Sequence, residues 1–196
     1  MNKQIVSRKL LATVILAAGF VCTSTAQAAL EDLGNGVIKD TDLGIVWLAD
    51  ANYSKTSGYN TNGVMNWNAA NTWVDQLNTG GHSDWRLPTT SEFSHLFYDE
   101  LGGVVNNNIY DTHTNASFAL FSNIQASGGY WTATPTGDAT TRSTFYFDSG
   151  SGFDQNMSFG HYAMAVAVIP EPETYAMLLA GLGLVGLIAR RKKQMA

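Results

Sequence analysis

Arg86 is the side chain that most clearly could have a chemical role, because residues 29–168 contain few other basic groups. It stands in a run that reads D-W-R-L-P-T-T-S-E from residue 84 to residue 92. A guanidinium between a tryptophan and a helix start can make several fixed hydrogen bonds at once. Two roles are open, an anion or ligand site and an internal clamp that joins strand, loop and helix. The clamp is favoured because a buried, paired arginine is commoner than an arginine ligand site.

The other reactive groups do not form a catalytic or metal-binding pattern. The histidines have no metal-ligand spacing, and none pairs with a nucleophile. The Asp-Gly run at 148–154 and the segment 40–42 could hold a cation, but aspartate and glycine are ordinary turn residues. Asp99 and Glu100 are adjacent on a predicted helix, so their side chains point in different directions and make no acid/base pair. We therefore expect no catalytic residue, no metal and no cofactor.

The elements around Arg86 predict how this side chain is held. The residue before a proline avoids the helical region, so the chain approaches Pro88 in an extended conformation. Thr89 then serves as a helix N-cap, and Glu92 three residues later completes a capping box. The helix should run to about Leu101. Its buried face is expected to consist of Phe93, Leu96 and Phe97.

The remaining patterns predict short strands and one further helix. Residues 37–40 and 45–48 form a β-hairpin pattern, and Asn66 can cap a helix whose apolar stripe extends from Trp67 to Leu77. Residues 50–63 have loop composition, and 102–129 is expected to be a long, partly ordered insertion. The remaining predicted elements are strands at 130–134, 144–148, 157–160 and 162–168, with a turn at 149–152. This order is typical of an α+β domain with two helices packed on short antiparallel strands.

The N-terminus has the pattern of a secretory signal. A basic stretch precedes an apolar run at 10–21, and Ala26 and Ala28 form an A-x-A cleavage site. Signal peptidase should then leave a mature chain that begins at Ala29. The single cysteine, Cys22, would be lost with the signal, so we expect no disulfide and no cysteine nucleophile in the mature protein.

The C-terminus carries a second targeting signal, which consists of a short motif, an apolar stretch and a basic end. Its parts are Pro170, Glu171 and Pro172, the apolar run at 175–189, and basic residues that begin with Arg190 and Arg191. The run is shorter than the ~20 residues of an ordinary spanning helix, but snorkelling basic ends can cover the difference. A plain membrane anchor is the alternative. The chain thus divides into a signal segment at 1–28, one domain at 29–168 and a C-terminal segment at 169–196.

This tripartite C-terminus resembles the PEP-CTERM sorting signal of Gram-negative bacteria. The resemblance implies export across the inner membrane and a transient transmembrane anchor. It also implies processing by an exosortase, delivery to the cell surface or beyond, and a link with exopolysaccharide and biofilm.

The domain between these two segments is strongly acidic. Fourteen of the sixteen acidic residues but four of the eleven basic residues lie at 29–168, so the formal charge of this segment is −10. Nucleic acid and anionic lipid surfaces are poor partners for such a charge. We therefore expect no nucleic-acid partner.

The order of motifs resembles that of the Lcl C-terminal-like domain. The resemblance covers nearly the whole domain, and its most specific residues are Asp84, Trp85, Arg86, Leu87, Pro88, Glu92 and Trp131. It implies a fold similar to the C-type-lectin and formylglycine-generating-enzyme group. The best-known members of the Lcl C-terminal-like family are surface adhesins that bind glycosaminoglycans. The family often ends on a strand with arginine and cysteine, whereas residues 163–168 here are alanine, methionine and valine.

A noncatalytic module that binds polysaccharide or another surface polymer is the favoured function. A glycan-processing hydrolase and a purely structural matrix protein are the alternatives. Aromatic side chains in loops could stack on sugar rings, and the candidates are Tyr53, Tyr59 and Tyr110. Because the domain is acidic, neutral or cationic glycans are better candidates than polyanions.

The two terminal segments make a prediction about processing. The extracellular form should begin at Ala29 and lack residues 190–193, because both ends carry targeting signals that are cleaved off. Intact-mass analysis of the protein recovered from the culture medium measures both ends. An extracellular species that retains the C-terminal apolar run would contradict the sorting interpretation.

Overall fold

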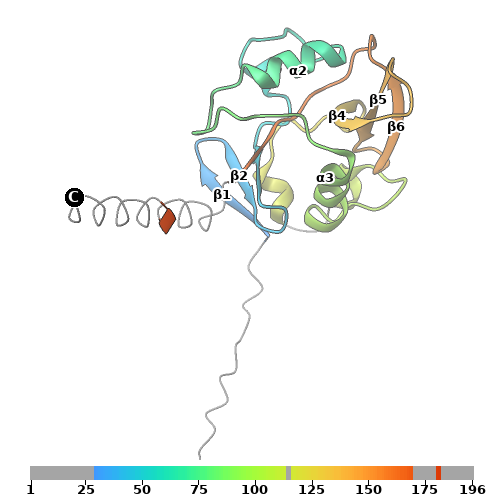
Figure 1. Ribbon diagram of the computed structural model, residues 1–196. Helices are drawn as coiled ribbons and strands as arrows, with labels where there is room; N and C mark the ends of the chain where they lie inside the picture. Colours follow the sequence, from blue (N-terminus) through green and yellow to red (C-terminus); the bar gives the residue numbers. More distant parts are fainter. Residues whose placement is uncertain (1–28, 114–115, 170–179, 182–196) are drawn as a thin grey trace, which may run out of the picture.

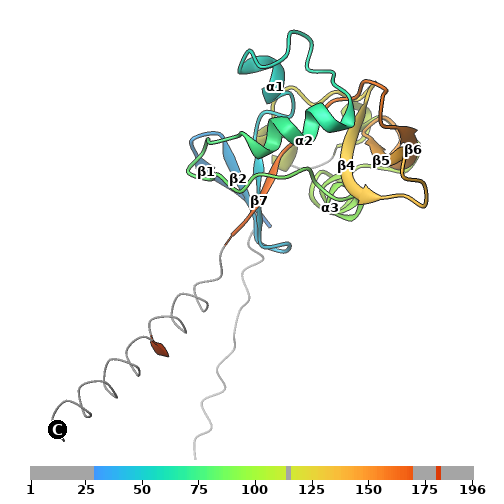
Figure 2. The ribbon, with the colours of Figure 1, turned by 45° about the horizontal axis from the view of Figure 1, so that its top comes forward.

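Two antiparallel sheets enclose the main core of the protein (Figure 1). The computed structural model describes residues 29–113, 116–169 and 180–181. The four-stranded sheet has the order β1-β2-β3-β7, and its strands are Leu30–Gly34, Val37–Asp40, Ile45–Leu48 and Val166–Val168. The three-stranded sheet has the order β4-β5-β6, and its strands are Gly129–Pro135, Thr141–Tyr146 and Ser151–Asn156. Figure 2 shows how β7 returns to the side of the β1–β2 hairpin.

Short helical segments connect the two sheets. The α-helices are α1 (Tyr53–Thr56), α2 (Trp67–Asp75), α3 (Thr90–His95) and α4 (Ile109–Thr112). A π-helix, η1 (Leu96–Glu100), continues α3, and a 3-10 helix, η2 (Ala116–Leu120), follows α4. Figure 1 shows α3 between the two sheets and α2 at the opposite side of the domain. The mixed α and β class is therefore confirmed, and the likeness to C-type lectins stays a prediction.

The predicted hairpin is present with the expected bounds. β2 and β3 pair in an antiparallel register that places Val37 opposite Leu48 and Asp40 opposite Ile45. β1 was not predicted, because only Leu30 is buried in it and the strand lacks an alternating apolar pattern. The turn between β1 and β2 uses positive φ angles at Gly34 and Asn35, 76° and 53°, which glycine and asparagine tolerate best.

Both predicted helices are present, with altered ends. The Asn66 side chain caps α2 by accepting a hydrogen bond from the Ala69 amide at 2.9 Å, but the helix ends at Asp75 instead of Leu77. The capping box of Thr89 and Glu92 begins α3 as predicted. Beyond His95 the helix widens into η1, so the helical stretch reaches Glu100 with a different hydrogen-bond pattern from the one expected.

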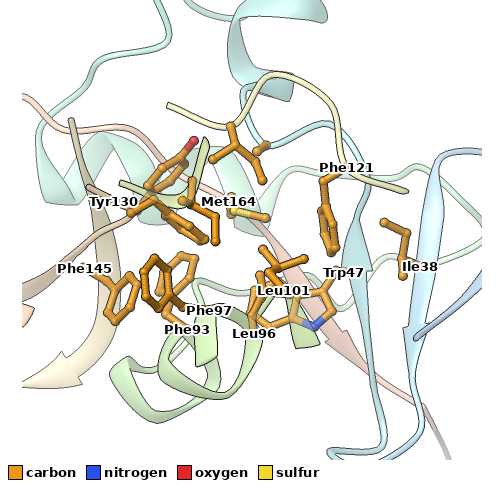
Figure 3. Close-up of a cluster of buried hydrophobic side chains, with 14 of the residues drawn as sticks. Ile38, Trp47, Phe93, Leu96, Phe97, Leu101, Phe121, Tyr130, Phe145 and Met164 are labelled. Atoms are coloured by element: carbon orange, nitrogen blue, oxygen red, sulfur yellow. The ribbon is translucent and has the colours of Figure 1, made fainter. Parts of the chain in front are cut away.

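The main hydrophobic cluster is centred on Phe93, which is fully buried (Figure 3). Its ring lies 5.5 Å from the ring of Phe145, 5.8 Å from that of Tyr130 and 5.8 Å from that of Trp47. These partners come from both sheets, because Trp47 lies on β3 whereas Tyr130 and Phe145 lie on β4 and β5. In Figure 3, Met164 lies between the aromatic rings of the three-stranded sheet and the side chains near Trp47. Phe93 therefore joins the two sheets through α3.

A second cluster lies under α2. Its tryptophans, Trp73, Trp85 and Trp131, are at most 3% exposed. The predicted apolar stripe of α2 is confirmed at Ala70, Trp73 and Val74, whereas Trp67 is only partly buried.

The described part of 102–129 is more ordered than the long, partly ordered insertion that the sequence predicted. The described part contains α4 and η2, and Ile109, Phe121 and Ile124 are buried in the main cluster. These apolar residues are isolated in an Asn-rich sequence, so no periodic pattern predicted their burial.

The last predicted strands also need correction. β6 at Ser151–Asn156 was not predicted, because most of its side chains are polar and exposed. Residues 157–160 form a turn instead of a strand, and only Val166–Val168 of the predicted final strand pairs in a sheet. β5 begins at Thr141, three residues before the predicted start at Thr144.

The predicted signal segment and nearly all of the predicted sorting segment lie outside the described residues. Among the residues that the structure describes, no helix combines the length and the apolar character needed to cross a membrane.

The central position of Phe93 generates a stability prediction. Phe93→Ala should lower the free energy of unfolding by about 3–5 kcal/mol, because it removes a fully buried ring and leaves a cavity. Urea unfolding followed by tryptophan fluorescence measures the loss. Phe159→Ala is the matched control, because Phe159 is 56% exposed and its removal should have little effect. Equal effects of the two substitutions would contradict the assigned core.

Candidate functional site

Arg86 makes a two-pronged ion pair with Glu92 inside the sequence motif. Its Nη2 lies 2.6 Å from Glu92 Oε1, and its Nη1 donates to Glu92 Oε2 at 2.9 Å. Nη1 also donates to the carbonyl oxygen of Leu87 at 3.1 Å. Glu92 accepts a further hydrogen bond from the Thr89 amide at 2.7 Å, so one carboxylate serves both the ion pair and the capping box. The guanidinium is thus engaged within the chain, as the clamp role predicts.

The backbone of Arg86 extends the clamp to the four-stranded sheet. The Arg86 amide donates to the carbonyl of Val166 at 2.8 Å, and the Val166 amide donates back at 2.9 Å. Val166 begins β7, whereas Glu92 belongs to α3. Arg86 therefore connects the last strand of one sheet with the helix that carries Phe93.

Electrostatics keep this pair ionised. Burial alone would raise the pKa of Glu92, but the hydrogen bonds from Arg86 and Thr89 together lower it below its ordinary value. The hydrogen bond to Glu92 raises the pKa of Arg86. The Glu92 side chain is 14% exposed, whereas the Arg86 side chain is 37% exposed. The pair therefore sits at the edge of the core.

The other motif residues also make contacts within the protein. The Trp85 indole donates to the carbonyl of His82 at 3.1 Å, and the Trp131 indole donates to the carbonyl of Met65 at 2.8 Å. Leu87 is fully buried, and the Pro88 carbonyl accepts a hydrogen bond from the Ala133 amide. Asp84 is exposed, 3.7 Å from the ring of His82.

The three tyrosines singled out in the sequence differ in their exposure. Tyr59 is 47% exposed in the loop after α1, and Tyr110 is 50% exposed in α4. The Tyr110 hydroxyl donates to the carbonyl of Ile124 at 2.6 Å, which fixes the orientation of its ring. Tyr53 is partly buried against the second cluster, so it offers less surface to a ligand. Tyr59 and Tyr110 thus remain candidate contacts, and they belong to separate segments.

A further group of aromatic side chains lies on the three-stranded sheet, where the sequence predicted only core aromatics. In the β5–β6 register Thr144 is opposite Phe153 and Tyr146 is opposite Ser151, so these side chains share one face of the sheet. Phe153 is 53% exposed, and its ring meets that of Tyr146 edge-on at 5.5 Å. We call this surface, formed by Trp67, Arg142, Tyr146 and Phe153, the aromatic face.

The far end of the aromatic face is formed by Arg142 and Trp67. The Arg142 guanidinium carbon lies 4.5 Å from the centre of the Trp67 ring, and the Trp67 indole donates to the carbonyl of Thr132 at 3.1 Å. Arg142 and Tyr146 are four residues apart on one strand, which corresponds to a distance of roughly 13 Å. The aromatic face therefore has rings near both ends of β5.

His161 lies next to Tyr146. Its ring is 6.2 Å from that of Tyr146 and 4.7 Å from that of Trp131. Burial lowers the pKa of His161, so its ring is neutral at pH 7. Gly129 allows this approach, since a Cβ there would come within 2.7 Å of the Tyr146 ring.

Asp40, His95 and Glu100 form a buried cluster that the sequence did not predict. His95 Nε2 lies 3.2 Å from Glu100 Oε1 and 3.7 Å from Asp40 Oδ2, and the side chains of Asp40 and Glu100 are 0% and 7% exposed. Burial, and to a lesser extent the charge of Asp40, raise the pKa of Glu100 above its ordinary value. Asp40 is far in sequence from the other two residues, and His95 and Glu100 are five residues apart, which is not a usual metal-ligand spacing. No sequence motif therefore predicted that the three side chains lie together.

The Arg86–Glu92 pair generates a prediction about stability and pH. Arg86→Ala should lower the free energy of unfolding by about 1–3 kcal/mol at pH 7, because the largely buried Glu92 loses its ionic partner. Because the folded-state pKa of Glu92 is lowered, its contribution is present above its ordinary pKa of 4.5 and is lost as the pH falls through the folded value. The difference between parent and variant should therefore shrink below pH 4.5.

Urea unfolding of both proteins across this pH range provides the measurement. The control is Lys39→Ala, because Lys39 and Glu31 form a surface pair at 3.9 Å that should contribute less than about 1 kcal/mol. A parent-like stability of Arg86→Ala at pH 7 would contradict the clamp.

Comparison with known families assigns both parts of the chain. The Lcl C-terminal domain model matches residues 36–167, and the PEP-CTERM protein-sorting motif matches residues 168–193. No curated protein matches the chain. The sorting motif implies processing by an exosortase and export to the cell envelope or surface of a Gram-negative bacterium. Because the first match covers more than half of its residues, the chain belongs to the Lcl C-terminal domain family and carries a PEP-CTERM sorting motif.

Proposed function

We propose that the protein is a noncatalytic binding module that holds a neutral polysaccharide at the cell surface or in the biofilm matrix. The single observation that supports this proposal best is the aromatic face. Phe153 leaves more than half of its surface in solvent on a regular strand, whereas Phe145 and Phe147, close by in the chain, are fully buried. An exposed ring on a regular strand has no role in the core, and apolar surface patches commonly mark binding sites.

The chemistry of the aromatic face suits sugar rings. Aromatic rings present flat apolar surfaces that stack on the C–H faces of sugars, and polar groups beside them can bind hydroxyls. Arg142 and Gln155 are opposite each other in the β5–β6 register, on the same side as Phe153. The spacing of roughly 13 Å between Arg142 and Tyr146 suits a few consecutive sugar units.

The charge of the domain favours a neutral polymer. With a formal charge of −10 at residues 29–168, a sulfated or uronic chain would be repelled unless cations bridge the two. The preference for a neutral polymer distinguishes the proposed ligand from the polyanions bound by the adhesins of the family.

The Asp40 and Glu100 carboxylates, which have oxygens within 4.8 Å of each other, are poorly placed for hydrolysis of a polymer. The Asp40 and Glu100 side chains are almost inaccessible to solvent, so a polysaccharide cannot reach them. This supports a binding role over the hydrolase alternative.

The proposal predicts a defined loss of binding. Phe153→Ala should weaken binding of the full-length, detergent-solubilised chain to a neutral polysaccharide about fivefold, because one stacked ring is worth about 1 kcal/mol. Affinity electrophoresis against neutral and acidic polysaccharides, with and without chelator, provides the measurement. Leu33→Ala is the matched control, since Leu33 is 47% exposed on β1 in the other sheet.

Three outcomes would overturn parts of the proposal. Unchanged binding by Phe153→Ala, with loss in Tyr59→Ala or Tyr110→Ala, would move the site to the loops. Turnover of any polysaccharide would refute the noncatalytic role. Tight, calcium-independent binding to heparin-like chains would refute the charge argument.

A further inference from the structure

We propose that Asp40, His95 and Glu100 bind a divalent transition-metal ion of the Zn²⁺ class, in a structural site independent of the aromatic face. One ligand atom from each of these side chains lies within 4.8 Å of the other two. Zinc binds nitrogen and oxygen ligands at about 2.0–2.1 Å, which places the ligands of a tetrahedral site about 3.3 Å apart. The observed separations of 3.2 Å and 3.7 Å from His95 Nε2 are close to this value.

The second nitrogen of His95 is already oriented. Nδ1 lies 3.1 Å from Asp99 Oδ2, within hydrogen-bonding distance. When Nδ1 carries the proton and donates it to Asp99, Nε2 keeps its lone pair and can act as a ligand atom beside Asp40 and Glu100. A carboxylate behind a histidine is the arrangement that fixes the ring and its tautomer in metal sites.

Hydrogen bonds also hold the Asp40 carboxylate in place. Asp40 Oδ1 accepts a hydrogen bond from the Leu43 amide at 3.0 Å, and Asp40 Oδ2 accepts one from the Trp47 indole at 3.2 Å. These bonds orient the carboxylate, and each oxygen retains a further lone pair. Asp40 is the last residue of β2, so it approaches the cluster from the four-stranded sheet.

His95 Nε2 provides the observation that points most directly to a cation. This atom is buried and makes no hydrogen bond, although two carboxylate oxygens lie within 3.7 Å. A buried polar atom without a partner is costly, and a bound ion is one of its ordinary explanations. A metal ion between the three side chains would satisfy Nε2 and balance two buried negative charges.

The π-helix explains how His95 and Glu100 come together. Residues five apart lie on different faces of an α-helix with 3.6 residues per turn. In η1 the Leu101 amide instead donates to the carbonyl of Leu96 at 2.9 Å, which is a hydrogen bond across five residues. The wider turn brings Glu100 back beneath His95, and such π-turns occur frequently at functional sites.

Three of the four described lysine and arginine side chains are engaged elsewhere, and the fourth, Lys55, is exposed on α1. Lys39 pairs with Glu31, Arg86 pairs with Glu92, and Arg142 lies over Trp67. The competing arrangement is a doubly protonated His95 that bridges the carboxylates with one positive charge. A metal ion supplies two charges and would tie β2 to the end of the long helical stretch.

Metal titration of the full-length chain tests the proposal. The protein is solubilised in detergent, purified without a polyhistidine tag, and carries Cys22→Ser so that its one thiol cannot bind zinc. After chelation and dialysis, Zn²⁺ is added and followed by calorimetry, and Co²⁺ is added and followed by its visible absorption. We expect one ion per chain, a tetrahedral Co²⁺ spectrum, and a rise in Tm of roughly 5 °C or more with Zn²⁺.

Matched variants locate the site. His95→Gln and Glu100→Gln should abolish stoichiometric binding and the Tm increase, whereas Asp99→Asn should weaken binding about 10–100-fold by removing the group behind His95. His113→Gln is the control, because its Nδ1 lies 3.0 Å from the Ile109 carbonyl, outside the cluster.

Two results would overturn the proposal. The first is a parent chain that binds no stoichiometric Zn²⁺ and shows a doubly protonated His95 by nuclear magnetic resonance at pH 7. The second is binding that persists unchanged in His95→Gln.

Discussion

The carboxylate of Glu92 is the group on which the rest of the structure depends. It caps α3 through the Thr89 amide at 2.7 Å, and it fixes the Arg86 guanidinium at 2.6 Å and 2.9 Å. Through the backbone of Arg86 this junction reaches β7, and through α3 it sets the position of Phe93 between the two sheets. One side chain therefore links a strand end, a helix start and the main core.

The same helical stretch determines where the polar groups of the core lie. Once α3 is anchored at Thr89, its continuation into η1 carries His95 and Glu100 to the end of β2, where Asp40 is buried. On the outer side, the β5–β6 hairpin exposes Phe153 beside Tyr146 while Phe145 faces inward. The alternation of side chains along β5 thus separates a core surface from the aromatic face on one sheet.

Local signals made part of this architecture predictable. The hairpin at 37–48 and the capping box of Thr89 and Glu92 depend on residues within a few positions of each other, so the sequence indicated both correctly. β6 was missed because an exposed, polar strand has no apolar alternation, and Phe153 looked like a single apolar residue in a turn. The cluster of Asp40, His95 and Glu100 was missed because it depends on a π-turn and on a contact between distant segments. Packing between elements, which no local pattern encodes, decided both cases.

The central claim is that a polymer binds to the outer surface of the three-stranded sheet. Amide and aromatic nuclear magnetic resonance shifts, followed during titration of the chain with a neutral oligosaccharide, test this claim most directly. We expect shifts concentrated on β5 and β6, at Arg142, Tyr146 and Phe153. Shifts confined to the loops at 50–63 and 102–129, with these strands unaffected, would contradict the claim.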